Sequence, residues 1–82
     1  MDLDDIIDEV QEASEDQSIP RRVREVLARV CQDLKAEDQD TAVKVTSVIY
    51  ELDDIANEVN IPVHAKTLLW DVISHLEAVK SV

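Results

Sequence analysis

The chain contains no glycine in 82 residues, and this absence constrains its fold more than any other feature. Tight turns between antiparallel strands use backbone conformations that glycine adopts far more readily than other residues. A sheet protein of this length would need several such turns. Only two prolines occur, and alanine, leucine, valine, isoleucine, glutamate and aspartate dominate the composition. The sequence therefore predicts an all-α protein.

Four segments have apolar residues at the three- and four-residue spacing that lines one face of an α-helix. The predicted helices cover residues 2–16, 19–36, 39–59 and 61–80. Their apolar faces are expected to form the core, and they consist of Leu3, Ile6, Ile7, Val10 and Ala13, then Val23, Val26, Leu27, Val30, Cys31 and Leu34, then Ala42, Val45, Ile49, Leu52, Ile55, Ala56 and Val59, and finally Ala65, Leu68, Leu69, Val72, Ile73, Leu76 and Val79.

Two of the predicted helices begin with the same signal. Pro20 and Pro62 are expected in the first turn of the second and fourth helices, where a missing N–H group costs nothing. Ser18 and Asn60 are the candidate N-caps of these helices.

The two halves of the sequence resemble each other at an offset of 42 residues. Ser18-Ile19-Pro20 then falls on Asn60-Ile61-Pro62, and the apolar positions of the helices coincide. Because the connections are only a few residues long, sequential helices should be antiparallel neighbours. We predict one helical-bundle domain over residues 1–82, an up-and-down four-helix bundle of two similar αα-hairpins with repeat halves at about 2–36 and 44–80.

Two segments, SIPRRVREVLARV and LDDIANEVNIPVHAKTLLWDVISHLEAVK, resemble an archaeal family of small helical proteins known as uncharacterised protein family 0147. The resemblance extends from about Ile6 to Lys80 and implies an archaeal source and a four-helix bundle. The family-like positions are Pro20, Arg21, Arg24, Leu52, Pro62, His64, Thr67, Trp70 and Glu77. Lys66 stands where the family pattern has an arginine, and Val59-Asn60 stands where it has an Asp-Pro-Asn-like turn. The family brings no established activity.

The net charge of −11 limits the partners of this chain. So many acidic residues disfavour nucleic acids and anionic membranes as ligands of the whole surface. They suit either an acidic docking surface for a basic partner or a solvated, salt-adapted surface. The acidic N-terminal segment does not resemble a signal peptide, and no uncharged apolar segment approaches the roughly 20 residues that span a bilayer. We expect a cytoplasmic protein.

Sequence motifs for catalysis are few. The single cysteine, Cys31, lies on an apolar helix face and is expected in the core rather than as a nucleophile. Asp71 and His75 lie one helical turn apart, which is a weak metal signal, and no glycine-rich phosphate loop occurs. We expect no enzyme activity, no metal and no cofactor.

Basic residues gather at the starts of the second and fourth helices, which lie at the same end of an up-and-down bundle. These residues are Arg21, Arg22, Arg24, His64 and Lys66. Together with the free N–H groups of two helix N-termini, they form a possible anion-binding site. Acidic residues at the ends of the first and third helices reach the same end and would neutralise the bases through salt bridges: Glu12, Glu15, Asp16, Asp54 and Glu58. Both interpretations stay open.

Four large apolar residues lie away from the predicted core faces of the third and fourth helices: Val43, Tyr50, Val63 and Trp70. The helical projection puts Trp70 about 140° from the centre of its apolar face. In antiparallel packing, Tyr50 and Trp70 lie at the same height. These residues form either an interface or a part of the core that a skewed bundle covers.

The leading prediction is therefore a non-enzymatic protein-interaction module that self-associates or docks an unknown protein through the face of the third and fourth helices. The alternative is a binder of phosphate-bearing ligands or RNA at the basic end.

Overall fold

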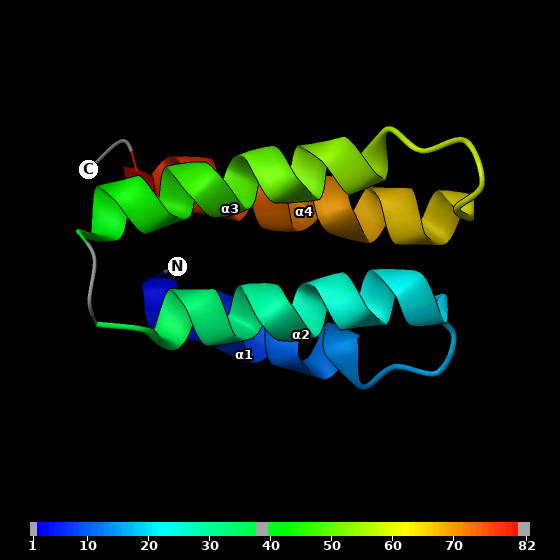
Figure 1. The fold of residues 1–82 in the computed structure, drawn as a ribbon, viewed down its shortest axis with the longest axis horizontal. Coiled ribbons are helices and arrows are strands. Elements are labelled where there is room, and N and C mark those ends of the chain that lie inside the picture. The colour runs from blue at the N-terminus through cyan, green and yellow to red at the C-terminus, as the bar shows by residue number, and fades with distance from the viewer. Residues whose placement is uncertain (1, 38–39, 81–82) are drawn as a thin grey trace.

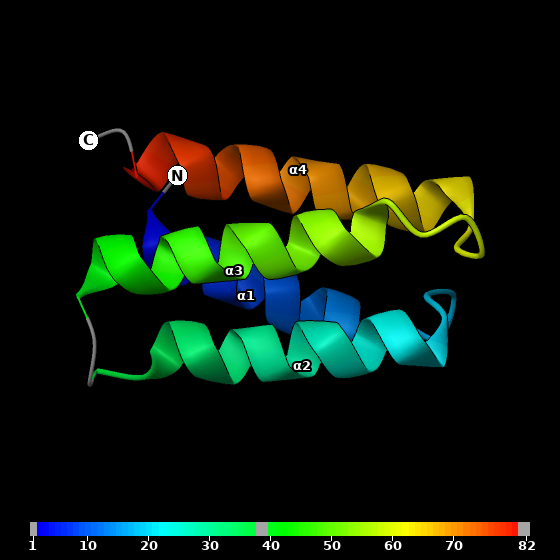
Figure 2. The same ribbon diagram turned by 45° about the horizontal axis from the view of Figure 1, so that its top comes forward.

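The structure, a computed structural model, describes residues 2–37 and 40–80. Its four helices are α1 (Leu3–Ser14), α2 (Arg21–Lys35), α3 (Thr41–Ala56) and α4 (Val63–Lys80). α1 and α2 form one antiparallel hairpin, and α3 and α4 form the other (Figure 1). The hairpins pack face to face, with α2 beside α3 and α1 beside α4 (Figure 2). This arrangement confirms the predicted four-helix up-and-down bundle of two similar hairpins.

The loops of both hairpins lie at one end of the molecule, and the chain termini lie at the other (Figure 1). The bundle measures 32 × 20 × 20 Å along its principal axes. Since both loops share one end, the starts of α2 and α4 lie there too. The basic residues that the sequence places at these starts are therefore brought to the same end of the bundle.

The helices begin later than the sequence predicts, and both proposed serine and asparagine caps are wrong. Pro20 has an extended ψ of 144°, so α2 begins at Arg21 without a side-chain cap. The N–H of Ser18 instead donates to Asp16 Oδ1 at 2.9 Å. Asn60 is separated from α4 by two residues, the second of which is Pro62. The carbonyl of Pro62 accepts hydrogen bonds from the backbone of the first turn.

Side-chain caps occur at the other two helices. Asp2 Oδ1 accepts from the N–H of Asp5 at 3.0 Å, and Asp40 Oδ1 accepts from the N–H of Ala42 at 2.8 Å. A carboxylate at this position satisfies a free N–H and opposes the positive end of the helix. Both helices thus begin on an aspartate. The predicted start of the third helix, residue 39, lies outside the described residues.

The two hairpin loops are equivalent in length and position. α1 ends at Ser14 and α3 at Ala56, while α2 starts at Arg21 and α4 at Val63, and both pairs differ by 42 residues. α1 and α3 therefore also end earlier than the predicted residues 16 and 59, because each loop returns its fifth residue, an isoleucine, to the core. The sequence prediction missed these two residues, Ile19 and Ile61, which are both buried. Their equivalent positions directly before the two aligned prolines were the signal that could have identified them.

The core is a single cluster that takes apolar residues from all four helices and both loops. The predicted face of α3 was partly wrong. Ala42 is exposed, and Val59 lies in the loop and is exposed, whereas Val48 was omitted and is buried. At 100° per residue, Val48 and Ile49 are both close to the face, and the prediction chose the latter. Its repeat partner Ile6, fully buried in α1, indicates Val48 instead.

Candidate functional site

The four apolar residues predicted outside the core are all on the surface. Their relative exposures are 56% for Val43, 72% for Tyr50, 77% for Val63 and 51% for Trp70. Exposed apolar side chains that are grouped on one surface, rather than scattered singly, often mark an interaction site. We call these four residues the α3–α4 patch.

The α3–α4 patch follows the outer side of the second hairpin. Val43 and Tyr50 are seven residues apart on α3, and Val63 and Trp70 are seven residues apart on α4, so each pair occupies one face across two turns. Tyr50 lies six residues before the end of α3 and Trp70 seven after the start of α4, which puts the aromatic residues at similar heights. With 1.5 Å of rise per residue, the patch extends over about 20 Å of the bundle.

Large exposed apolar residues are confined to the second hairpin in the described part of the chain. The exposed large hydrophobic residues are the α3–α4 patch and Val59, which is 90% exposed in the α3–α4 loop. The first hairpin uses the same architecture but has polar or small residues at four of the five corresponding positions, and the fifth, Met1, which corresponds to Val43, lies outside the described residues. With the offset of 42, Tyr50, Val59, Val63 and Trp70 correspond to Asp8, Gln17, Arg21 and Ala28.

The different outer residues of the two hairpins show which positions the fold itself leaves free to vary. Both hairpins bury equivalent faces and use equivalent loops, so the fold does not need an apolar residue at these outer positions. The sequence prediction placed Val59 in the core and therefore missed it as a surface residue. The polar residue at the equivalent position of the first hairpin, Gln17, was the signal that could have placed Val59 on the surface.

Charge is also distributed unequally. Residues 1–40 contain thirteen acidic residues and five lysines or arginines, a net charge of −8, whereas residues 41–82 contain six and three, a net charge of −3. The apolar surface therefore belongs to the less charged half of the molecule.

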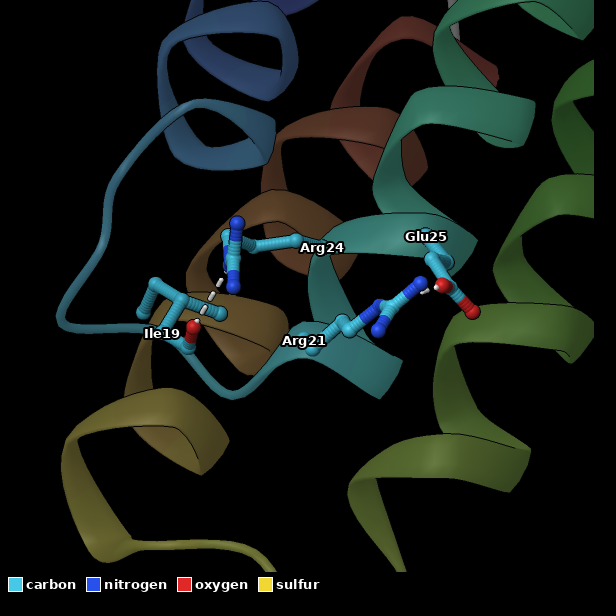
Figure 3. Close-up of polar contacts among 4 residues, drawn as sticks. All are labelled: Ile19, Arg21, Arg24 and Glu25. Carbon is cyan, nitrogen blue, oxygen red and sulfur yellow. Dashed lines mark hydrogen bonds and ion pairs between the residues drawn. The ribbon is translucent and has the colours of Figure 1, made fainter.

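At the basic end, Arg21 and Arg24 point away from each other. Arg24 extends toward the loop, where its Nε donates to the carbonyl of Ile19 at 2.9 Å, and Arg21 extends along α2 to Glu25 at 3.1 Å (Figure 3). The two guanidinium groups thus have separate internal partners and do not converge on a common point.

The remaining basic residues of this end also have internal partners. Lys66 Nζ donates to the carbonyl oxygens of Ala56 at 2.8 Å and Glu58 at 2.7 Å, next to the C-terminus of α3. A cation there compensates carbonyl groups that have no helical partner. His64 Nε2 lies 2.8 Å from the carbonyl oxygen of Ser18, and Arg22 forms an ion pair with Glu58.

Arg22 and His64 occupy equivalent places in the two hairpins, and each reaches the loop of the other hairpin. Arg22 pairs with Glu58, and the repeat partner of Glu58 is Asp16, which interacts electrostatically with His64. The backbone N–H and the hydroxyl of Ser18 lower the pKa of Asp16, and His64 adds a smaller effect in the same direction. The bases thus join the two loops across the bundle.

Of the acidic partners predicted at this end, Glu58 pairs with Arg22 and Asp16 interacts with His64. Arg24, His64 and Lys66 have backbone carbonyl oxygens as their hydrogen-bond partners. Farther along the bundle, Arg29 pairs with Glu51, which raises the pKa of the guanidinium through hydrogen bonding. Every lysine and arginine side chain that the structure describes has an internal acceptor, and these side chains are Arg21, Arg22, Arg24, Arg29, Lys35, Lys44 and Lys66.

The other candidates from the sequence are parts of the bundle. Cys31 is buried, with Sγ 4.0 Å from the carbonyl oxygen of Ile7, as predicted for a core thiol. His75 faces α1 rather than Asp71, and its Nδ1 lies 2.9 Å from Glu9 Oε1. Within residues 2–37 and 40–80, no three His, Cys, Asp or Glu residues are grouped so that they could hold a metal ion. None of the helices, over the residues described, has the length and apolar character to cross a membrane.

Comparison with known proteins identifies similar chains in archaea. The model of a family described as "Uncharacterised protein family (UPF0147)" matches residues 1–79. A UPF0147 protein of Methanothermobacter thermautotrophicus is 41% identical over 66 residues, which are 80% of this chain and 65% of that protein, just under two thirds of its length. A UPF0147 protein of Methanocaldococcus jannaschii is 32% identical over 95% of this chain and 76% of its own length.

Solved structures give the same result for the fold. The crystal structure of a protein from this uncharacterised family, from Thermoplasma acidophilum, has a TM-score of 0.88 and 32% sequence identity. The match covers 93% of this chain and 89% of that one. The fold and the relatives implied by the sequence resemblance are therefore confirmed.

Proposed function

The chain belongs to the uncharacterised protein family UPF0147, and we propose that it is a non-enzymatic protein-interaction module that docks its partner on the α3–α4 patch. One observation carries this proposal. The second hairpin exposes two aromatic residues and two valines at positions where the equivalent first hairpin has Asp8, Gln17, Arg21 and Ala28. Since the same fold forms with polar or small residues at these positions, we infer that the large apolar residues serve something other than folding.

The chemistry of the α3–α4 patch suits a protein partner. Tryptophan and tyrosine are the residues that most often dominate the binding energy of protein interfaces, because they bury a large area at low entropic cost. Trp70 and Tyr50 project from rigid helices rather than from loops, so little order has to be created on binding.

Substitution of Trp70 by alanine, the residue at the equivalent position of the first hairpin, tests the proposal. Because the side chain of Trp70 is half exposed, Trp70→Ala should stay folded and lose about 1.5–2.5 kcal/mol, roughly half of the 3–5 kcal/mol that a fully buried tryptophan would cost. The variant should lose the capture of protein partners from nuclease-treated extract of the native host. Urea unfolding followed by circular dichroism and affinity capture measure the two effects.

Asp8→Ala is the matched control, since Asp8 is the exposed repeat partner of Tyr50 on the first hairpin. This variant should capture the same proteins as the wild type. Unfolding of Trp70→Ala, or unchanged capture by it, would contradict the proposal.

The competing hypothesis is a phosphate or RNA site at the basic end. The internal partners of Arg24 and Lys66 argue against it, because these side chains already donate to backbone carbonyl oxygens and are held away from a common ligand. Arg24→Ala should therefore lower the melting temperature equally in chloride, sulfate and phosphate of matched ionic strength. A stabilisation by phosphate that only the wild type shows would favour the anion site.

A further inference from the structure

We infer that the occupant of the α3–α4 patch is a cationic protein segment, in which lysine or arginine side chains flank aliphatic ones, rather than a second copy of this chain. This inference rests on the proposed function and specifies the chemistry of its partner. It depends on which charged groups of the described residues are already engaged within the bundle and which are left on the surface.

The acidic groups on the outer side of the second hairpin are the first part of the argument. Glu51 and Glu58 are occupied by Arg29 and Arg22 at the seam between the hairpins. Asp54 lies one helical turn after Tyr50 on α3 and is exposed, and the structure gives it no ion-pair partner among the described residues. Asp71, next to Trp70 on α4, is exposed in the same way. The patch therefore has acidic neighbours that are available to a cation.

The aromatic residues strengthen the same preference. A lysine ammonium or an arginine guanidinium over the face of an exposed tryptophan or tyrosine is attracted by the ring. Tyr50 combines such a ring with the carboxylate of Asp54, which lies one turn farther along the same face of α3, whereas Asp71 lies about 100° around α4 from Trp70. A partner segment with alternating aliphatic and cationic side chains would satisfy both the patch and its acidic neighbours.

A second copy of the chain does not supply these cations. Arg21, Arg22 and Arg29 are ion-paired within the bundle, Lys44 is buried, and Arg24 and Lys66 are half-buried on backbone carbonyls. Over its described residues, a copy would therefore present few unpaired positive charges on its surface, and its net charge is −11. Like charges brought together across an interface cost binding energy. Nucleic acids and anionic lipids are repelled for the same reason.

Selection from a phage-displayed library of random 16-residue peptides tests the inference without assuming a sequence. Full-length protein is the bait, and Trp70→Ser and Tyr50→Ser are the counter-selection baits. Selected peptides should be enriched in lysine and arginine together with leucine, isoleucine or valine. Synthetic versions should bind the wild type more than about 30-fold tighter than Trp70→Ser, as expected when an interface residue of the dominant kind is removed.

A pair of charge-matched variants separates local from general attraction. Asp54→Asn with Asp71→Asn removes two charges near the patch, and Asp8→Asn with Glu12→Gln removes two from exposed positions of α1. The first pair should weaken peptide binding about two- to five-fold per charge, and the second should have a clearly smaller effect. Circular dichroism of all variants verifies that they are folded.

The outcomes distinguish the two proposals. Neutral or acidic peptides that still require Trp70, a dimer that Trp70→Ser abolishes in sedimentation experiments, or equal effects of both charge pairs would overturn the cationic partner and leave the proposed docking surface intact. Selected peptides that bind Trp70→Ser and Tyr50→Ser as well as the wild type, or the absence of any patch-dependent peptide, would overturn both.

Discussion

Several lysine and arginine side chains of this bundle hold carbonyl oxygens near helix ends. Lys66 reaches carbonyls at the end of α3, and the buried Lys44 of α3 donates to the carbonyl of Ala36, directly after α2. A helix leaves its last carbonyl groups unpaired and partly negative, so a cation at this position both donates hydrogen bonds and opposes the dipole. Helices commonly end on a glycine with a positive φ, which satisfies their last carbonyl groups. This chain has no glycine, and no described residue has a positive φ, so lysine and arginine side chains satisfy some of these carbonyls instead.

Removal of the Lys66 ammonium should therefore destabilise the protein. Lys66→Met keeps the aliphatic stem but loses two hydrogen bonds from a charged donor, and we expect a loss of about 1.5–3 kcal/mol. Lys35→Met is the control, because Lys35 is exposed and donates to Gln11 at 3.3 Å, so it should change stability by less than about 0.5 kcal/mol. Urea unfolding at neutral pH gives both values. Equal effects of the two variants would show that Lys66 acts only through its general charge.

Asp16 should make a pH-dependent contribution to stability. Its pKa is lowered from 3.8 in the folded state, mainly by the hydrogen bond from the N–H of Ser18. A group with a lowered folded pKa stabilises the native state above its unfolded pKa, and the contribution disappears as the pH falls through the folded value. The stability difference between wild type and Asp16→Asn should thus be constant at neutral pH and shrink below pH 3.8.

Urea unfolding of both proteins across a pH series measures this difference. Asparagine retains an oxygen that accepts from Ser18, so the comparison isolates the charge. A difference that grows as the medium becomes more acidic would have the wrong sign for this account.

At the level of helices and hairpins, the sequence predicted the number of helices, their pairing and most of the core, because apolar spacing and the internal repeat depend only on local geometry. The helix ends were less accurate. The ends of the helices depend on how each loop returns Ile19 or Ile61 to the core. This is a tertiary contact, and a helical projection of the helix before or after the loop does not show it. Val48 and Val59 were misplaced for a related reason, since both lie near the edge of a helical face or beyond a helix end.

The candidate site was predictable to the same extent. The exposure of Trp70 and Tyr50 follows from their angles on the helices, and the gathering of the bases follows from the topology. The partners of those bases were not predictable, because a guanidinium at the start of a helix has carboxylates and carbonyl oxygens within similar reach. Arg24 binds the carbonyl of Ile19 where a salt bridge with Glu12 or Asp16 was equally compatible with the sequence.

The equivalence of the two hairpins should be visible in their stability contributions. Leu27 and Leu69 are repeat partners, and both are fully buried at corresponding heights of α2 and α4. Leu27→Ala and Leu69→Ala should each cost about 2–5 kcal/mol and should agree within about 1 kcal/mol. Denaturant unfolding with a common slope measures this. A large inequality would mean that one hairpin relaxes around the cavity and that the two halves are not mechanically alike.

For the molecule as a whole, charge and apolar surface are segregated between the halves. The first hairpin carries most of the excess negative charge, and the second carries the exposed aromatic and aliphatic residues. In such an arrangement, the negative electrostatic field of the whole molecule attracts a cationic partner. The apolar contacts of the α3–α4 patch then determine where the partner binds. It also keeps two copies apart, because the surfaces around each patch have the same sign.

The same excess charge should make stability depend on salt. Nineteen acidic residues against eight lysines and arginines repel one another in the compact state, and ions screen this repulsion within about 8–10 Å at physiological ionic strength. Salt also weakens the ion pairs Arg21–Glu25, Arg22–Glu58 and Arg29–Glu51, but exposed pairs of this kind contribute only about 0–1 kcal/mol each. The repulsion should dominate, so the melting temperature should rise as KCl increases from tens of millimolar to molar concentrations. A variant with Asp4, Asp5 and Asp8 changed to asparagine should show a smaller rise, since it removes three charges from the more acidic hairpin. A flat or falling curve for the wild type would indicate that its acidic residues are already compensated within the fold.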